Sequence, residues 1–216
     1  MAYLLLDPTH PLPLVLVAAA GGYLSGSVPY GLILSRMAGA GDIRKSGSGN
    51  IGATNVLRVV GKKVAAATLL LDALKGFVPV AVAGSFHQDY AILAAFGAFF
   101  GHLFPVWLKF KGGKGVATAL GISFGFSWIL GSAVCGIWLF MAGVTQYSSL
   151  SALTAFGLAP LIALRATGDL QVTATVFIIT IIIWIRHHEN IRRLFKGTES
   201  KINFNKKSPD KKEEAA

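Results

Sequence analysis

The feature that most constrains this chain is a series of long apolar segments that no water-soluble domain of this size could bury. They cover about residues 13–34, 64–86, 90–108, 115–144, 150–164 and 170–185. A helix needs about 20 apolar residues to cross the hydrocarbon core of a bilayer. Charged residues make up only 14% of the chain, against about 25% in typical soluble domains. The sequence therefore predicts an all-α integral membrane protein.

The segment over residues 115–144 is too long for one span of about 20 residues. A turn in "FSWILG", around Ser127, would divide it into two short helices. This division predicts about seven transmembrane helices. Five spans is the alternative, if the short segments are re-entrant.

The basic residues indicate an orientation. Eighteen of the twenty Lys and Arg residues follow the first, third or seventh predicted span. With seven spans and the N-terminus outside, these three connections share one side of the membrane. Basic loops face the cytoplasm, so the C-terminus is predicted to be cytoplasmic. Orientation and attraction to anionic lipid also account for the net charge of +10, and no nucleic-acid partner is expected.

Four polar segments are predicted to lie on that same side. They read "GDIRKSGSGNIGATNVLRVVGKK", "LKFKGGKGVAT", "TQYSSLS" and "RHHENIRRLFKGTE". Glycines let backbone N–H groups approach a ligand and form concave anion sites. Arg58 and Lys114 add positive charge suited to phosphate. One shared phosphate site is predicted. The alternative, in which glycines make turns and cations only orient the protein, leaves Asn50, Thr54 and Asn55 unexplained.

Two familiar nucleotide motifs do not apply. The glycines of "GSGNIG", with Asp72 twenty residues after the last, match a dinucleotide fingerprint, but no strand precedes them and Asp72 lies in an apolar segment. "GGKG" is not a phosphate-binding P-loop, because Leu108 and Gly115 occupy positions that require glycine and a hydroxyl residue. No cofactor is expected. No spacing predicts a metal site, for which "HHE" from His187 is weak evidence.

The polar segments resemble the bacterial acyl-phosphate:glycerol-3-phosphate acyltransferases, integral membrane enzymes of phospholipid synthesis. The matching motifs are "SGSVPYG" with "GSGNIGATNVLR", then "GHLFPVWLKFKGGKGVAT", then "YSSLSA" with "HHENIRRLFKGTE". The resemblance covers about residues 22–199. It implies seven transmembrane helices in the bacterial cytoplasmic (inner) membrane and a site facing the cytoplasm. It also implies transfer of a fatty acyl group from acyl phosphate to the first-carbon hydroxyl of glycerol 3-phosphate, giving lysophosphatidic acid and inorganic phosphate.

The resemblance also implies which residues form the site. Catalytic roles would fall to Ser48, Arg58, Lys114, His187 and Asn190. Substrate and phosphate binding would fall to Gly47, Gly49, Asn50, Gly52, Thr54, Asn55, Gly112, Gly113, Gly115 and Ser149. Glu199 belongs to the third motif, and Gln146 stands where many members carry a basic residue.

Acyl phosphate is a mixed anhydride that a hydroxyl can attack directly, so no covalent acyl-enzyme is expected. The serines lack a recognisable Ser–His–acid arrangement, and Cys135 lies in an apolar run where it is expected to be a buried small hydrophobe. No H-x-x-x-x-D pair, the pattern of acyl-CoA-dependent acyltransferases, follows any histidine. The proton of the attacking hydroxyl could pass to His187 or to the substrate phosphate, and the sequence leaves both open.

Three polar groups inside apolar segments have open roles. Asp72 and Lys75 lie at i, i+3 and could form an internal ion pair or contact substrate. His102 could make a structural hydrogen bond or belong to the site. The mixture of apolar and basic residues from Ile191 to Lys196 predicts an amphipathic helix at the membrane interface.

Residues 1–204 are expected to form one transmembrane catalytic domain, followed by a charged, disordered tail over residues 205–216. The expected partners are acyl phosphate, glycerol 3-phosphate and membrane lipid. The second candidate function is transport of a phosphorylated solute or lipid. A transporter would place polar groups near the bilayer midplane within repeated halves, and neither feature is evident here.

Overall fold

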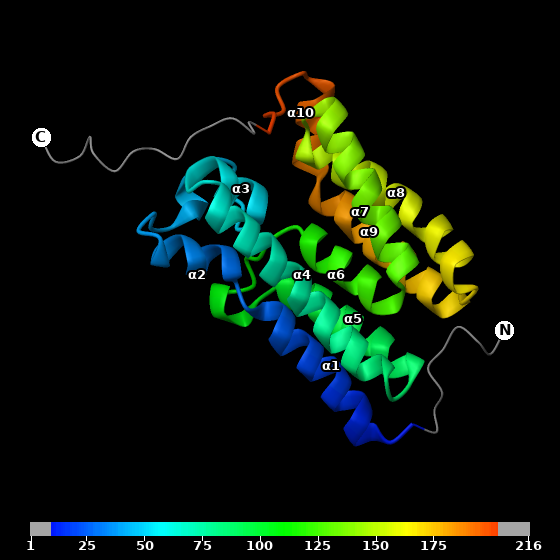
Figure 1. Ribbon diagram of the computed structural model, residues 1–216. Coiled ribbons are helices and arrows are strands. Elements are labelled where there is room, and N and C mark those ends of the chain that lie inside the picture. The colour runs from blue at the N-terminus through cyan, green and yellow to red at the C-terminus, as the bar shows by residue number, and fades with distance from the viewer. Residues whose placement is uncertain (1–9, 203–216) are drawn as a thin grey trace, which may run out of the picture.

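The protein is a bundle of α-helices, seen in a computed structural model that describes residues 10–202 (Figure 1). Helix α1 packs against α5, α4 packs against both α5 and α6, and α6 connects this group to the layer formed by α7, α8 and α9. The short helices α3 and α10 lie at one end of the molecule. The elements are α1 (Leu12–Ser27), α2 (Tyr30–Met37), η2 (Ile43–Lys45), α3 (Ala53–Val59), α4 (Lys62–Gly84), α5 (Gln88–Leu103), η3 (Val106–Leu108), α6 (Val116–Phe126), α7 (Trp128–Thr145), α8 (Ser148–Thr167), α9 (Leu170–Arg186) and α10 (His188–Phe195).

Within the described residues, five helical stretches are long and apolar enough to cross a membrane. A sixth is reached if α9 and α10, which are bent by 59° at His187, are counted as one span. The prediction of an all-α protein with several apolar spans is confirmed. The count of seven is not reached by these measures, because α6 has 11 residues and α9 alone has 17. The five stretches are Leu12–Met37, Lys62–Gly84, Gln88–Leu108, Trp128–Thr145 and Ser148–Thr167.

The predicted turn at Ser127 is confirmed. Helix α6 ends at Phe126, and Ser127 adopts an extended backbone as the N-cap of α7. Its side chain accepts a hydrogen bond from the Leu130 backbone N–H. The long apolar run is thus divided by a residue whose hydroxyl satisfies an otherwise unpaired helix-end donor.

Helices α1 and α5 approach closely through small residues spaced four apart. Gly22 and Gly26 on α1 meet the segment of α5 that contains Gly97 and Gly101. A Cβ atom at Gly26 would lie 2.0 Å from the Ala98 carbonyl oxygen, and one at Gly101 would lie 2.3 Å from that of Tyr23. Such small-xxx-small contacts let membrane helices pack backbone to backbone.

We expect Gly26→Ala to lower the unfolding temperature in detergent, because the added methyl group forces the α1–α5 contact apart. Overpacking of this kind costs about 1–3 kcal/mol. Gly21→Ala is the matched control, since a Cβ atom there meets nothing within 4 Å. Both variants gain the same helix propensity, about 1 kcal/mol. Equal unfolding temperatures for the two would contradict the close-packing account.

The polar segment between α2 and α4 is more ordered than a loop. It contains η2 and α3, and its residues Ile43, Ile51 and Val56 form a small buried apolar cluster with Leu32 of α2 and Ala65 of α4. This cluster fixes α3 against the start of α4. The segment therefore has the packing needed to hold polar side chains in defined positions.

The two charges within α4 form an internal ion pair, one of the two roles that the sequence left open. Lys75 Nζ lies 2.6 Å from Asp72 Oδ1, and both side chains are almost fully buried. Lys75 also donates to the carbonyl oxygen of Val28, at the break between α1 and α2, over 2.8 Å. The pair therefore links α4 to the point where Pro29 interrupts the first helical stretch.

Candidate functional site

The four polar segments meet around one cavity of about 360 Å³. Eleven of the fifteen predicted site residues line it, together with Glu199 and with Asp72 and His102, whose roles the sequence left open. Lys62 and Ser148 also line it and were not predicted. Gly47, Gly49, Gly112 and Gly113 are not among the lining residues. The eleven are Ser48, Asn50, Gly52, Thr54, Asn55, Arg58, Lys114, Gly115, Ser149, His187 and Asn190.

A buried carboxylate, Glu199, organises one wall of the cavity. Its Oε1 accepts hydrogen bonds from Ser149 Oγ at 2.7 Å and from Asn190 Nδ2 at 2.6 Å, and its Oε2 accepts from Arg193 Nε at 2.6 Å. Burial alone would raise the pKa of Glu199, but these donors hold that pKa below its usual value. Glu199 is therefore a fixed anion that orients Ser149 and Asn190.

Asn190 carries this network on to Lys114. With its Nδ2 donating to Glu199, its Oδ1 accepts a hydrogen bond from Lys114 Nζ. Burial lowers the pKa of Lys114 to about 8, and the positive charge of Arg193 acts in the same direction. An incoming anion would therefore stabilise the protonated form of Lys114.

Arg58 supplies the second cation of the cavity. Its guanidinium donates to the carbonyl oxygen of Ser200 over 3.0 Å, while its buried Nε has no hydrogen-bond partner within residues 10–202. Burial lowers the pKa of Arg58. Arg58 and Lys114 therefore share the cavity with Lys62, and Glu199 is already bonded to three other donors.

Asn55 has a different role from the predicted phosphate ligand. Its Oδ1 accepts from the backbone N–H of Ser48 at 2.8 Å, and its Nδ2 donates to the carbonyl oxygens of Ile43, Ser46 and Asn50. All its polar atoms are engaged with the backbone, so it folds the segment around Ser48.

Gly47 belongs to the same arrangement. Its φ is +62°, and a Cβ atom there would lie 2.2 Å from Asn55 Oδ1. The glycine is needed both for the left-handed backbone and for the close approach of the Asn55 amide.

The glycine pair before Lys114 also differs from the prediction of an N–H cradle. The backbone N–H groups of Gly112 and Gly113 donate to the carbonyl oxygens of Leu103 and His102, at the end of α5. A Cβ atom at Gly113 would lie 2.2 Å from His102 Nε2. These glycines therefore let the segment fold back against α5, with His102 packed against it.

His187 lies between α9 and α10 and faces the cavity. Its Nδ1 is 2.7 Å from the carbonyl oxygen of Ile183. A carbonyl can only accept, so Nδ1 carries the hydrogen. In the neutral ring this leaves Nε2 with a lone pair. The pairing of Nδ1 with a backbone carbonyl also means that His187 is not the centre of a Ser–His–acid triad.

The remaining wall of the cavity is apolar and comes mainly from α4, α6, α7 and α8. Cys135 is among its residues, so it lies in apolar surroundings as expected, but it is half-buried and not fully buried. The cavity therefore has a cationic, polar part and an apolar part. The apolar lining includes Leu120 of α6, Val134, Cys135, Trp138 and Leu139 of α7, and Phe156 of α8.

Comparison with known proteins agrees with this arrangement. A family profile described as glycerol-3-phosphate acyltransferase matches residues 16–197. Proteins of that name from Sinorhizobium fredii and Brucella canis are each 57% identical to the chain, over 88% and 84% of its length and 94% and 90% of theirs.

Two solved structures are also similar. The crystal structure of PlsY, an integral membrane glycerol 3-phosphate acyltransferase, in its glycerol 3-phosphate form is 35% identical, with a TM-score of 0.80 over 89% of this chain and 95% of that one. The lysophosphatidic acid form is 36% identical, with a TM-score of 0.81 over 87% and 94%.

Proposed function

Because this chain belongs to the glycerol-3-phosphate acyltransferase family, we propose that it transfers a fatty acyl group from acyl phosphate to the first-carbon hydroxyl of glycerol 3-phosphate. The products are lysophosphatidic acid and inorganic phosphate. The observation that carries this proposal is the two-part cavity, in which Arg58 and Lys114 lie at the polar part and helices α6–α8 supply an apolar wall. Both substrates carry phosphate, and one carries a long acyl chain.

The reaction needs no enzyme nucleophile. The glycerol hydroxyl attacks the acyl carbonyl carbon, the bond from that carbon to the phosphate oxygen breaks, and phosphate leaves with the bonding electrons. In this proposal the proton of the attacking hydroxyl passes to an oxygen of the substrate phosphate. His187 Nε2 accepts a hydrogen bond from the second hydroxyl of glycerol 3-phosphate, and this contact positions the attacking hydroxyl beside it.

Among the predicted site residues, four groups have distinct roles in this proposal. Arg58 and Lys114 bind phosphate, and Ser48, Asn50, Thr54 and Ser149 offer polar side chains to the substrates. Asn190 holds Lys114. Asn55 and the five glycines other than Gly52 act by shaping the two segments that carry these groups.

The proposed topology has seven spans, with α6 and α9 as the two short ones. The N-terminus is outside, and the site faces the cytoplasm of a bacterial cell across its cytoplasmic (inner) membrane. The distribution of basic residues supports this orientation. Residues 1–204 form one catalytic domain, and the predicted tail over residues 205–216 lies outside the described residues.

Labelling with a membrane-impermeant maleimide tests this topology. In a Cys135→Ala background, we expect Arg165→Cys to react in spheroplasts and Lys111→Cys to react only after permeabilisation. Both positions are exposed, so access to the reagent depends on the side of the membrane. Reaction of both from the same side would contradict seven spans.

The function itself is tested with purified protein in detergent, glycerol 3-phosphate and palmitoyl phosphate. We expect release of inorganic phosphate and formation of lysophosphatidic acid without added nucleotide. Palmitoyl-CoA should be a poor donor, because its thioester has no adjacent phosphate for the cations of the cavity. If palmitoyl-CoA is turned over and palmitoyl phosphate is not, the proposal that acyl phosphate is the donor is rejected. Absence of product with either donor would favour the transport alternative.

A further inference from the structure

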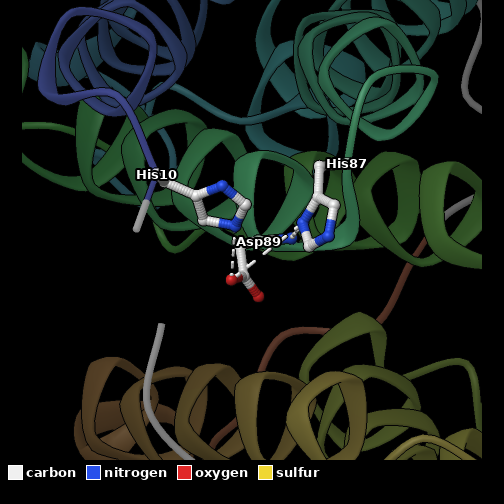
Figure 2. A group of neighbouring side chains, drawn as sticks. All are labelled: His10, His87 and Asp89. Atoms are coloured by element: carbon white, nitrogen blue, oxygen red, sulfur yellow. Dashed lines mark hydrogen bonds and ion pairs between the residues drawn. The ribbon is translucent and has the colours of Figure 1, made fainter. Parts of the chain in front are cut away.

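A second group of chemically reactive side chains lies outside the residues that line the cavity (Figure 2). His10 lies two residues before the start of α1, His87 is the N-cap of α5, and Asp89 lies in the first turn of α5. Helix α4 begins at Lys62, and its residues as far as Asp72 line the cavity. It ends at Gly84, three residues before His87, so about 18 Å of helix separates the cavity from this group at 1.5 Å per residue.

One ligand atom from each residue lies within 4.8 Å of the other two. His10 Nε2 is 2.9 Å from Asp89 Oδ2, and His87 Nδ1 is 4.0 Å from the same oxygen. Ligand atoms at about 2.0–2.2 Å around a tetrahedral ion are about 3.3 Å apart. The two separations bracket that value, so small side-chain shifts bring all three onto one ion.

The residues around this group also favour metal binding. Tyr90 Oη lies 3.3 Å from His10 Nδ1, where it can accept the hydrogen of that nitrogen and leave Nε2 with its lone pair. Metal-bound imidazoles typically donate their other N–H in this way. Asp89 is buried, whereas the His87 side chain is 49% exposed, so water can reach a fourth coordination position.

We propose that His10, His87 and Asp89 bind a divalent first-row transition ion, with Zn²⁺ as the ion of choice and water as its fourth ligand. Two imidazoles and one carboxylate suit such ions, whereas Mg²⁺ and Ca²⁺ prefer oxygen ligands. Binding replaces the 3.2 Å hydrogen bond that His87 Nδ1 accepts from the Asp89 backbone N–H. The ion joins the chain before α1 to the start of α5, and so stabilises the α1–α5 contact at that end.

The test uses full-length protein in detergent, purified with an affinity tag that contains no histidine and stripped of metal with a chelator. Titration with Zn²⁺ against a chromogenic chelator should give one tight site. We expect His10→Ala and His87→Ala each to weaken it by at least tenfold. The unfolding temperature of the wild type should rise with Zn²⁺ concentration, and this rise should be lost in both variants.

His188→Ala is the matched control. It removes one largely exposed imidazole near the cavity, whose Nε2 lies 3.5 Å from a carboxylate oxygen of Glu189. The tight Zn²⁺ site should remain intact in this variant. Co²⁺ should give the visible absorption of a four-coordinate ion in the wild type and not in His87→Ala.

His87→Ala should retain acyl transfer activity, since the residue lies far from the cavity, and this activity shows that the variant is folded. Equal Zn²⁺ affinity in the wild type and in a folded His10→Ala/His87→Ala variant would overturn the proposal. So would loss of the tight site in His188→Ala.

Discussion

His187→Ala is expected to lower kcat by about 100-fold or more in protein that remains folded. Positioning of a reacting group and general base catalysis each contribute on this scale, so the alanine variant measures the importance of His187 and not its role. Because Nδ1 is bonded to the carbonyl oxygen of Ile183, Nε2 is the ring nitrogen expected to contact substrate.

The two amide variants separate the roles. A glutamine amide reaches about as far as Nε2, whereas an asparagine amide reaches about as far as Nδ1. If His187 positions the hydroxyl, His187→Gln should recover a substantial part of kcat and His187→Asn less. An amide cannot accept a proton at neutral pH. Burial lowers the pKa of His187 from its usual value to about 4. Equal loss in all three variants, with a wild-type rate that falls as the pH drops through that pKa, would assign the proton to His187.

The membrane class and the convergence of the polar segments could be predicted because both depend on local properties of the chain. The length of an apolar segment identifies a span. The number of Lys and Arg residues in each connection between spans indicates which connections lie on the same side of the membrane. The turn at Ser127 was predictable for the same reason, since two short helices must be separated somewhere in a run of about 30 apolar residues.

The division between ligands and supporting residues could not be predicted. Asn55 and Gly113 lie within the same motifs as Arg58 and Lys114, and all four are polar or small. Only the fold shows that Asn55 bonds to four backbone groups and that Gly113 packs on His102. A sequence motif records which residues a site needs but does not distinguish contact with substrate from support of its neighbours.

Long-range pairs were missed for a different reason. His10 and His87 are far apart in the chain and follow no ligand spacing, so their proximity depends on how α1 packs against α5. Glu199 offered one signal, a carboxylate at the end of a basic segment of the third motif. Its role depends on the hydrogen bonds that Ser149 and Asn190 donate to it, and these follow from the fold.

Lys114→Ala is expected to lower kcat/KM for glycerol 3-phosphate by roughly 10–150-fold, which corresponds to the loss of one charge-assisted contact of about 1.5–3 kcal/mol. Lys111→Ala is the matched control, because it removes the same charge from the same segment at an exposed position outside the cavity. Its effect should be less than about threefold. Equal losses in the two variants would mean that the segment acts through its overall charge and that Lys114 makes no specific phosphate contact.

The pH dependence gives a second measure of the same contact. Only the protonated lysine attracts phosphate, and burial has lowered the pKa of Lys114 to about 8 in the free protein. The phosphate of the substrate loses its second proton near pH 6. Binding should therefore be strongest between about pH 6 and 8 and should weaken as the pH rises through 8. Lys114→Arg should have a lower kcat/KM at neutral pH, because Asn190 is fitted to an ammonium group. Since an arginine keeps its charge above pH 8, its kcat/KM should fall less steeply between pH 8 and 9.5. Parallel profiles for the two proteins would show that another group controls the alkaline limb.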